Sequence, residues 1–222
     1  MKKRKGQLVG KIVTITAIAA GVGCIVLSII GYIEVKNAYL EATRQELHSA
    51  VTVADSEFSK MWDGDWEYDG TTLTKGGEPV YDEYLETMEK LKAETDLEYT
   101  IFYNDTRAVT TLKKAGSNDY LLNTQASSEV VNEVIGGNTT SYKPNIEIEG
   151  IKYYGYYSPM TNTDGSVAGM MFVGRESSDI TSTIRRVSFM LVAVTILVIV
   201  VIVLIGVFAS KAAGTAFAQA LG

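Results

Sequence analysis

Two uncharged runs of 22 residues, at 12–33 and 187–208, constrain this chain more than any other feature. A helix of that length reaches about 33 Å at a rise of about 1.5 Å per residue. The hydrocarbon core of a bilayer is about 30 Å thick. Both runs therefore predict transmembrane helices. The alternatives are a cleaved signal peptide for the first run and a buried core helix for the second.

The distribution of charge predicts how the chain crosses the membrane. All 26 acidic residues and 14 of the 20 basic residues lie within residues 34–186, which gives this segment a net charge of −12. Four consecutive basic residues occupy positions 2–5. Because basic residues next to a span stay in the cytoplasm, we expect cytoplasmic tails at residues 1–11 and 209–222. Residues 34–186 then form an extracellular domain.

The composition excludes several classes of protein. A net charge of −6 argues against general nucleic-acid binding. The single cysteine, Cys24, and the single histidine, His48, leave no disulfide framework and no multi-cysteine or poly-histidine metal site. A calcium loop from Asp63 fails because Tyr68 stands where glycine is needed and Thr74 where glutamate is needed. We expect no catalytic activity, no cofactor and no metal.

A long amphipathic helix is predicted after the first span. Its apolar positions recur at helical spacing, at Leu40, Leu47, Val51, Ala54, Phe58 and Met61. No proline or glycine interrupts residues 35–62, so the helix is expected to continue the span outward. This stripe can pack on its own domain or on a second copy of the chain, and both can hold on different turns. We expect a homodimer.

The rest of the extracellular segment predicts an α+β domain with an antiparallel sheet. A short helix carries Tyr84 and Met88, and a second helix is capped by Ser127 or Ser128. Five strands are expected at residues 99–103, 108–112, 142–148, 151–160 and 167–174. Turn sequences such as Glu149-Gly150 and Asp164-Gly165 separate the last three strands.

This order of elements between two spans resembles the single Cache domain of bacterial membrane receptors, an extracellular relative of the PAS fold. The stretches DLEYTIFYNDTRAVTTL (residues 96–112) and IEGIKYYGYYSPMTNTDGSVAGMMFVGRE (residues 148–176) carry the resemblance. It covers about residues 34–186 and is greatest to the sensory halves of methyl-accepting chemotaxis proteins. It implies that the domain binds a small extracellular molecule and signals across the membrane.

One departure from such receptors affects the expected output. The segment ASKAAGTAFAQALG after the second span lacks the early proline of a HAMP linker, and no long coiled coil follows. The chain is therefore either the sensory portion of a longer receptor or a short sensor. A histidine kinase or a cyclic-dinucleotide enzyme is an alternative output, and cytoplasmic signalling partners are expected only if an output domain follows. A membrane-anchored domain that binds a partner protein and no small ligand is the other alternative.

Arg107 is the leading candidate for ligand binding. It is the only basic residue between Lys92 and Lys113, and it is the last residue of the turn predicted at residues 104–107, which leads into a strand. A guanidinium can grip a carboxylate with two parallel hydrogen bonds, and the resemblance implies this role. The alternative is a surface arginine paired with Asp105. Lys143 and Lys152 are expected to be solvated, and His48 is expected to be solvated or at a dimer contact.

Strand alternation adds candidates that could line the same pocket. We expect Thr110, rather than Thr111, to face it. Phe102 and Tyr103 are both candidates, because parity alone does not say which of these neighbours points inward. Two further candidates, Tyr153 and Tyr157, share one face of their strand with Gly155. By resemblance, the glycine removes a second positive charge, so we expect a small acid with one carboxylate.

Overall fold

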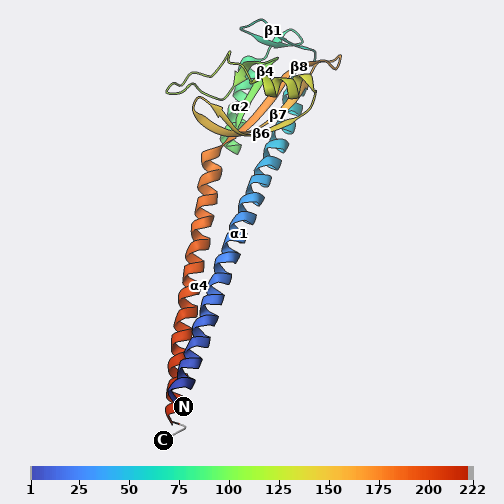
Figure 1. Ribbon diagram of the computed structural model, residues 1–222. Helices are drawn as coiled ribbons and strands as arrows, with labels where there is room; N and C mark the ends of the chain where they lie inside the picture. The colour runs from blue at the N-terminus through green and yellow to red at the C-terminus, as the bar shows by residue number, and fades with distance from the viewer. Residues whose placement is uncertain (1, 220–222) are drawn as a thin grey trace. The chain divides into compact units, whose positions relative to one another are not determined.

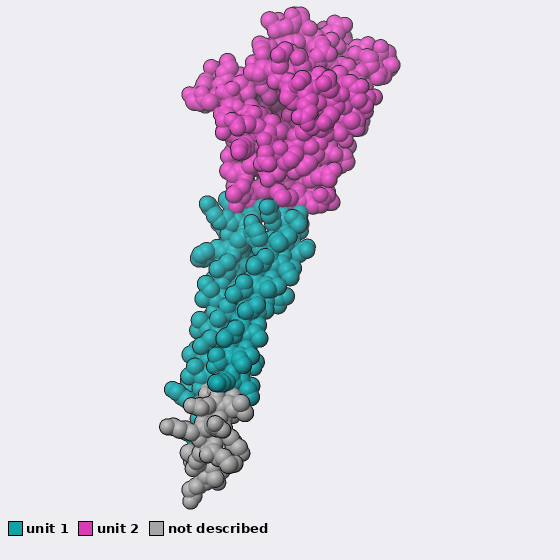
Figure 2. Space-filling model, in the orientation of Figure 1, with its two compact units in different colours: residues 1–39, 182–222 teal, residues 40–181 magenta. Residues whose placement is uncertain are grey.

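A computed structural model of the chain describes residues 2–219. It divides into two compact units, one of residues 1–39 and 182–222 and one of residues 40–181 (Figure 2). The basic side chains at residues 2–5, which predict the orientation in the membrane, lie outside the described part. The last three residues of the predicted tail, 220–222, also lie outside it.

The first unit consists of apolar helix. It contains the beginning of α1 (Lys2–Met61) and most of α4 (Ser177–Gln219), drawn in blue and in orange to red in Figure 1. Both helices are long and apolar enough to cross a membrane. Large apolar side chains such as Leu27 and Phe189 are 70% and 75% exposed, which is unlike a buried core helix. As predicted, α1 runs on without a break into the second unit.

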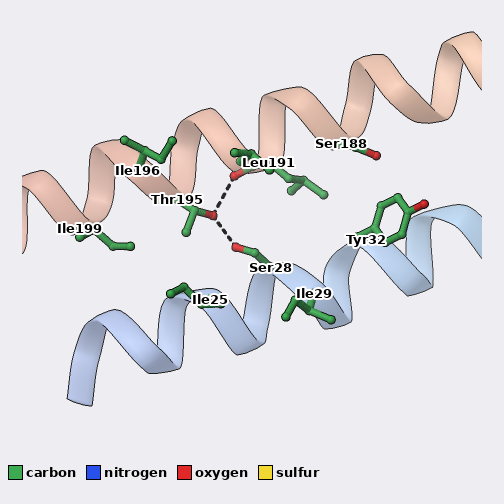
Figure 3. Close-up of a pocket in the computed structure, with 10 residues that line it drawn as sticks. Ile25, Ser28, Ile29, Tyr32, Ser188, Leu191, Thr195, Ile196 and Ile199 are labelled. Atoms are coloured by element: carbon green, nitrogen blue, oxygen red, sulfur yellow. Dashed lines mark hydrogen bonds between the residues drawn. The ribbon is translucent and has the colours of Figure 1, made fainter. Parts of the chain in front are cut away.

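Two hydroxyl groups meet between the helices of this unit. Ser28 and Thr195 contact each other through their hydroxyl oxygens, as Figure 3 shows. Each hydroxyl also lies within hydrogen-bonding distance of a carbonyl one turn back, at 2.9 Å from Cys24 and 2.8 Å from Leu191. The surrounding pocket, of about 440 Å³, is lined mainly by aliphatic side chains. Bonding to the preceding turn keeps these hydroxyls paired in apolar surroundings.

The second unit is built on a five-stranded antiparallel sheet with strand order β5-β4-β8-β7-β6. The strands are β4 (Glu98–Tyr103), β5 (Thr106–Thr110), β6 (Ser141–Ile148), β7 (Ile151–Thr161) and β8 (Val167–Glu176). The hairpins expected from the turn sequences are all present. Glu149 and Gly150 both have positive φ, at 50° and 79°, as a tight two-residue hairpin requires.

One face of the sheet packs against helices, and we call it the helical face. The buried apolar residues of α1 are Leu47, Val51, Ala54 and Phe58, so the predicted apolar stripe is confirmed from Leu47 to Phe58. Helix α2 (Tyr81–Thr95) adds Tyr84 and Met88. The sheet contributes the buried side chains Tyr99, Ile101, Val109, Met171 and Val173. Nearly all of this face is aliphatic or aromatic, so burial of apolar surface stabilises it.

A small second sheet follows α1. Its strands are β1 (Trp66–Tyr68), β2 (Leu73–Lys75) and β3 (Glu78–Pro79), paired antiparallel in that order. Trp66 is buried and meets the ring of Tyr84 edge-on at 5.8 Å. The small sheet therefore extends the hydrophobic core of the helical face.

The last helical segment lies between β5 and β6. Ser127 caps α3 (Ser128–Val131) by accepting a hydrogen bond from Val130 N, which decides between the two predicted caps. The chain then continues as one π-helical segment, η1 (Asn132–Gly136), and Gly137 follows it. Together with the long helix and the antiparallel sheet, this confirms the predicted α+β fold.

Candidate functional site

The face of the sheet opposite the helical face holds the candidate site, and we call it the Arg107 face. Side chains directly opposite each other on neighbouring strands share a face. Arg107 thus lies beside Phe102 and Met170, and Thr110 lies in a row with Thr100, Phe172 and Tyr157. The buried apolar residues of this face are Phe102, Leu112, Leu121, Val130, Val134, Tyr153, Tyr157, Met170 and Phe172.

A β-bulge directs Arg107 to this face. Val109 pairs with Ile101 and lies on the helical face, so strict alternation would put Arg107 there as well. The register shifts between Ile101 and Phe102, and Ala108 is the extra residue. Bulges commonly re-aim a side chain in this way. The two-residue turn at Asn104 and Asp105 also means that Arg107 is the second residue of β5, not part of the predicted turn.

The Arg107 side chain is buried and only partly paired. It is 5% exposed, and its guanidinium lies 4.9 Å from the centre of the Phe102 ring. Nη1 donates a hydrogen bond to the hydroxyl of Thr124, and two backbone hydrogen bonds hold residues 123 and 124 against β5. Nε is buried and has no hydrogen-bond partner. A buried donor without a partner is costly and uncommon in native structures.

No carboxylate neutralises Arg107 in the part of the chain that the structure describes. The ion pairs between described side chains do not include it. The alternative partner from the sequence, Asp105, accepts instead from the hydroxyl of Thr106. Arg175, on the helical face, also has a buried Nε without a partner, but it differs from Arg107 because it forms an ion pair with Glu46 at 2.7 Å.

Burial perturbs the titratable groups of this face. It lowers the pKa of Arg107 to about 10, an effect partly opposed by Tyr157 and Glu149. It raises the pKa of Tyr157 to about 12, opposed by the Arg107 charge. Burial, reinforced by Glu98 and Glu176, also raises the pKa of Tyr153 to about 12. At neutral pH the site therefore combines one cation with two protonated tyrosine hydroxyls.

Thr110 lies on this face, as predicted, but its hydroxyl is engaged. It lies 2.6 Å from the hydroxyl of Thr100 on the neighbouring strand, and it accepts a hydrogen bond from Leu112 N at 3.1 Å. Both threonines are fully buried. Thr110 therefore supports the floor of the face rather than offering an unpaired hydroxyl.

Tyr103 is not brought together with the other candidates. It packs against the core of the helical face, with its ring 6.1 Å from that of Tyr68. Neighbours on a strand point to opposite faces, and Phe102 is the member of the pair on the Arg107 face. Of the two candidates that the sequence left open, Phe102 therefore lies on the Arg107 face, and the candidate Tyr103 is wrong.

A continuous segment, residues 121–137, covers the Arg107 face. Leu121, Val130 and Val134 are its buried contacts. At one end of the cover, Tyr68 donates to the side chain of Asn123 at 2.6 Å. At the other end, side chains of β6 form polar contacts with two glutamates of this segment, Glu129 and Glu133.

Those contacts correct the expectation that Lys143 is solvated. Its Nζ lies 2.6 Å from Glu129 and 2.8 Å from Glu133. The hydroxyl of Ser141 also donates to Glu133 at 2.6 Å. Lys152 is exposed, as expected. His48 is also exposed, with its ring 5.0 Å from that of Tyr156.

Sequence reasoning missed several residues of this face, and Thr124 and Phe172 matter most among them. Thr124 lies 17 positions from Arg107, and no local pattern connects them. Phe172 did have a signal, because Gly155 and Gly174 stand in strands that the meander predicts to be neighbours. Small residues at facing positions leave room for a large side chain above them.

Comparison with protein families identifies residues 80–187 as matching the family described as Single cache domain 3. This segment includes α2, every strand of the five-stranded sheet and the first turns of α4. The match confirms the resemblance to single Cache domains over these residues. Comparison with curated proteins gives no match.

Solved structures with a similar chain path include sensory domains from Campylobacter jejuni. The ligand-binding domain of chemoreceptor Tlp3 in complex with L-valine has 12% identity and a TM-score of 0.47, covering 69% of this chain and 60% of that one. The sensory domain of Tlp3 (CcmL) has 10% identity and a TM-score of 0.45, covering 78% and 66%. This chain thus spans about 60% of the length of the first of these domains.

Proposed function

We propose that the single Cache domain of this chain is the ligand-binding part of a chemoreceptor-type membrane protein. Its ligand is a small molecule with one carboxylate, bound by Arg107. One observation carries the proposal: Arg107 is buried, has a free Nε and lacks a carboxylate partner among the described residues. A ligand carboxylate supplies both the missing charge and the missing acceptor.

The neighbours of Arg107 suit one end of such a ligand. Tyr157 keeps its proton at neutral pH, since burial raises its pKa to about 12, so its hydroxyl can donate to an anion. Phe102 supports the guanidinium from below. This constellation binds and orients a ligand, and we assign it no catalytic role.

The preference for a single carboxylate follows from the charges on the same face. Lys143 lies opposite Gly155 in the sheet register, so it shares the Arg107 face. Its ammonium group already forms ion pairs with Glu129 and Glu133. Arg107 is then the one cation on this face, among the described residues, that lacks an anionic partner. A second carboxylate would meet no free positive charge.

We place this domain outside the cell, with both apolar helices in the membrane and the N-terminus in the cytoplasm. The charge distribution of the sequence supports this orientation. Labelling with a membrane-impermeant maleimide tests this orientation. The natural cysteine, Cys24, lies within the first predicted span, so labelling reports on an introduced cysteine. A cysteine at exposed Ser117 should be labelled in intact cells and one at Ala209 should not. The reverse pattern would refute the orientation.

Signalling would use the direct connection from the sheet to the membrane helix. β8 ends at Glu176, α4 begins at Ser177, and the buried Ile180 holds the first turn of α4 in the domain. We propose a homodimer with two arrangements. A ligand shifts the equilibrium between them only by the difference in its affinity for the two. Val53 of α1 is 60% exposed, and cross-linking of a Val53→Cys variant tests the dimer contact.

The decisive experiment measures ligand binding to the full chain in detergent or nanodiscs. Monocarboxylates, dicarboxylates and amino acids are screened by thermal shift, and hits are measured by calorimetry. Arg107→Ala should weaken a monocarboxylate by about 10- to 150-fold, the loss expected for a charge-assisted hydrogen bond. The affinity of Arg107→Lys should lie between those of the wild type and Arg107→Ala, because lysine keeps the charge but cannot form two parallel hydrogen bonds with a carboxylate.

The matched control is Arg175→Ala, which removes the arginine of the helical face and should leave affinity unchanged. Unchanged affinity in Arg107→Ala refutes the assigned role. A folded wild-type chain that binds no member of the panel refutes the proposed ligand class.

A further inference from the structure

Two glycines face each other at the centre of the Arg107 face. Gly155 of β7 and Gly174 of β8 are register partners. Glycine within a strand weakens it, because glycine loses more backbone freedom and offers no side chain to pack. Two such residues side by side in the interior strands of the sheet therefore need a compensating reason.

The ring of Phe172 occupies the space above both glycines. A Cβ added at Gly155 would lie 2.5 Å from the Phe172 ring and 2.5 Å from Ile146 Cδ1. A Cβ at Gly174 would lie 2.5 Å from the same ring. Phe172 is fully buried. The glycines thus allow the ring to lie flat against the sheet.

The same ring stands next to the proposed anchoring groups. Phe172 pairs with Tyr157 across the strands, and their ring centres are 4.9 Å apart. Tyr157 in turn interacts electrostatically with Arg107. A ligand whose carboxylate lies at Arg107 and Tyr157 and whose body runs along the sheet would meet Phe172 before it reached the two glycines.

We propose that Phe172, seated on Gly155 and Gly174, sets the maximum length of the apolar part of the ligand. This inference rests on the proposed function, since it presumes a carboxylate at Arg107. Phe172 acts as the end wall of the site and selects short acids. Without its ring, the space above the glycines would admit further methylene groups of the ligand.

The test measures the affinity of the full chain for straight-chain monocarboxylates from acetate to octanoate. Wild type should bind most tightly at one chain length. Phe172→Ala should move that maximum to longer acids, with about a fourfold gain for each additional methylene that the vacated space buries. Gly155→Ala crowds the ring from below and should move the maximum to shorter acids.

Val173→Ala is the matched control, because Val173 is the next residue of β8, is equally buried, and lies on the helical face. It should lower stability without moving the preferred length. Phe172→Leu, a milder change, gives the same test if the alanine variant does not fold. The same preferred length in wild type and in the Phe172 variants overturns this inference while leaving the proposed function standing. Absence of binding to the wild type overturns both.

Discussion

The helical face and the Arg107 face belong to the same sheet, and both are buried. Each face carries one arginine, but of the two only the arginine of the helical face has a carboxylate partner. Arg175 on the helical face has Glu46 as an ion-pair partner and also donates to the carbonyl of Thr95 at 3.3 Å. Among the described side chains, Arg107 donates a hydrogen bond only to the hydroxyl of Thr124. A paired arginine joins parts of the fold, whereas an unpaired buried one retains binding capacity. The comparison assigns stability to the helical face and, under the proposed function, recognition to the Arg107 face.

The largest expected effect comes from damage to the helical face. Phe58 is fully buried and meets the ring of Tyr84 edge-on at 4.9 Å. Phe58→Ala should lower the free energy of unfolding by about 3–5 kcal/mol, because it leaves a cavity. Chemical denaturation followed by tryptophan fluorescence measures this, since both tryptophans, Trp62 and Trp66, lie in the second unit. Ligand affinity of the folded variant should be unchanged, and a loss of affinity would break the division between the faces.

A smaller effect of opposite sign is expected on the Arg107 face. Arg107→Met keeps the apolar stem and removes a buried charge with an unpaired Nε. It should raise the free energy of unfolding by about 1 kcal/mol and abolish carboxylate binding. Arg175→Met is the matched change on the helical face. It should lower stability by less than about 1 kcal/mol, because Glu46 is partly exposed, and should leave binding intact. Equal destabilisation by both changes would contradict the comparison.

The smallest effect concerns the cover of the Arg107 face and depends on pH. Hydrogen bonds from Lys143 and Ser141 lower the pKa of Glu133. A lowered carboxyl pKa stabilises the fold above the unfolded pKa of about 4.3, and this stabilisation is lost as the pH falls through the folded pKa. Glu133→Gln should therefore melt below wild type at pH 7, and the gap should shrink as the pH falls towards about 3. Glu57→Gln, at an exposed position of α1, is the matched control for the loss of a carboxylate.

The sequence predicts this fold well where the signal is local. Turn pairs such as Glu149-Gly150 mark the hairpins, and the apolar spacing from Leu47 to Phe58 marks the buried side of α1. These patterns depend on backbone conformation and helical periodicity, which a few neighbouring residues determine. The element order and the antiparallel sheet follow from them.

The site was predicted less completely, because its geometry depends on contacts between distant residues. The bulge at Ala108 decides which way Arg107 points, and alternation alone gives the opposite answer. Phe102 and Tyr103 are both aromatic, so composition cannot assign their faces. Lys143 was expected in solvent because its partner Glu129 lies 14 residues away on another element. Tertiary packing settles each of these points.

The connection between β8 and α4 constrains insertions and deletions. β8 is the central strand of the sheet, and no residue separates its last position, Glu176, from the first position of α4, Ser177. Each residue of an α-helix turns the chain by about 100°. Adding or removing one residue at this joint would therefore change the helical phase of every later side chain by that angle relative to the sheet. Three or four residues would nearly restore it, so length changes at this joint are tolerable only in steps of about one helical turn.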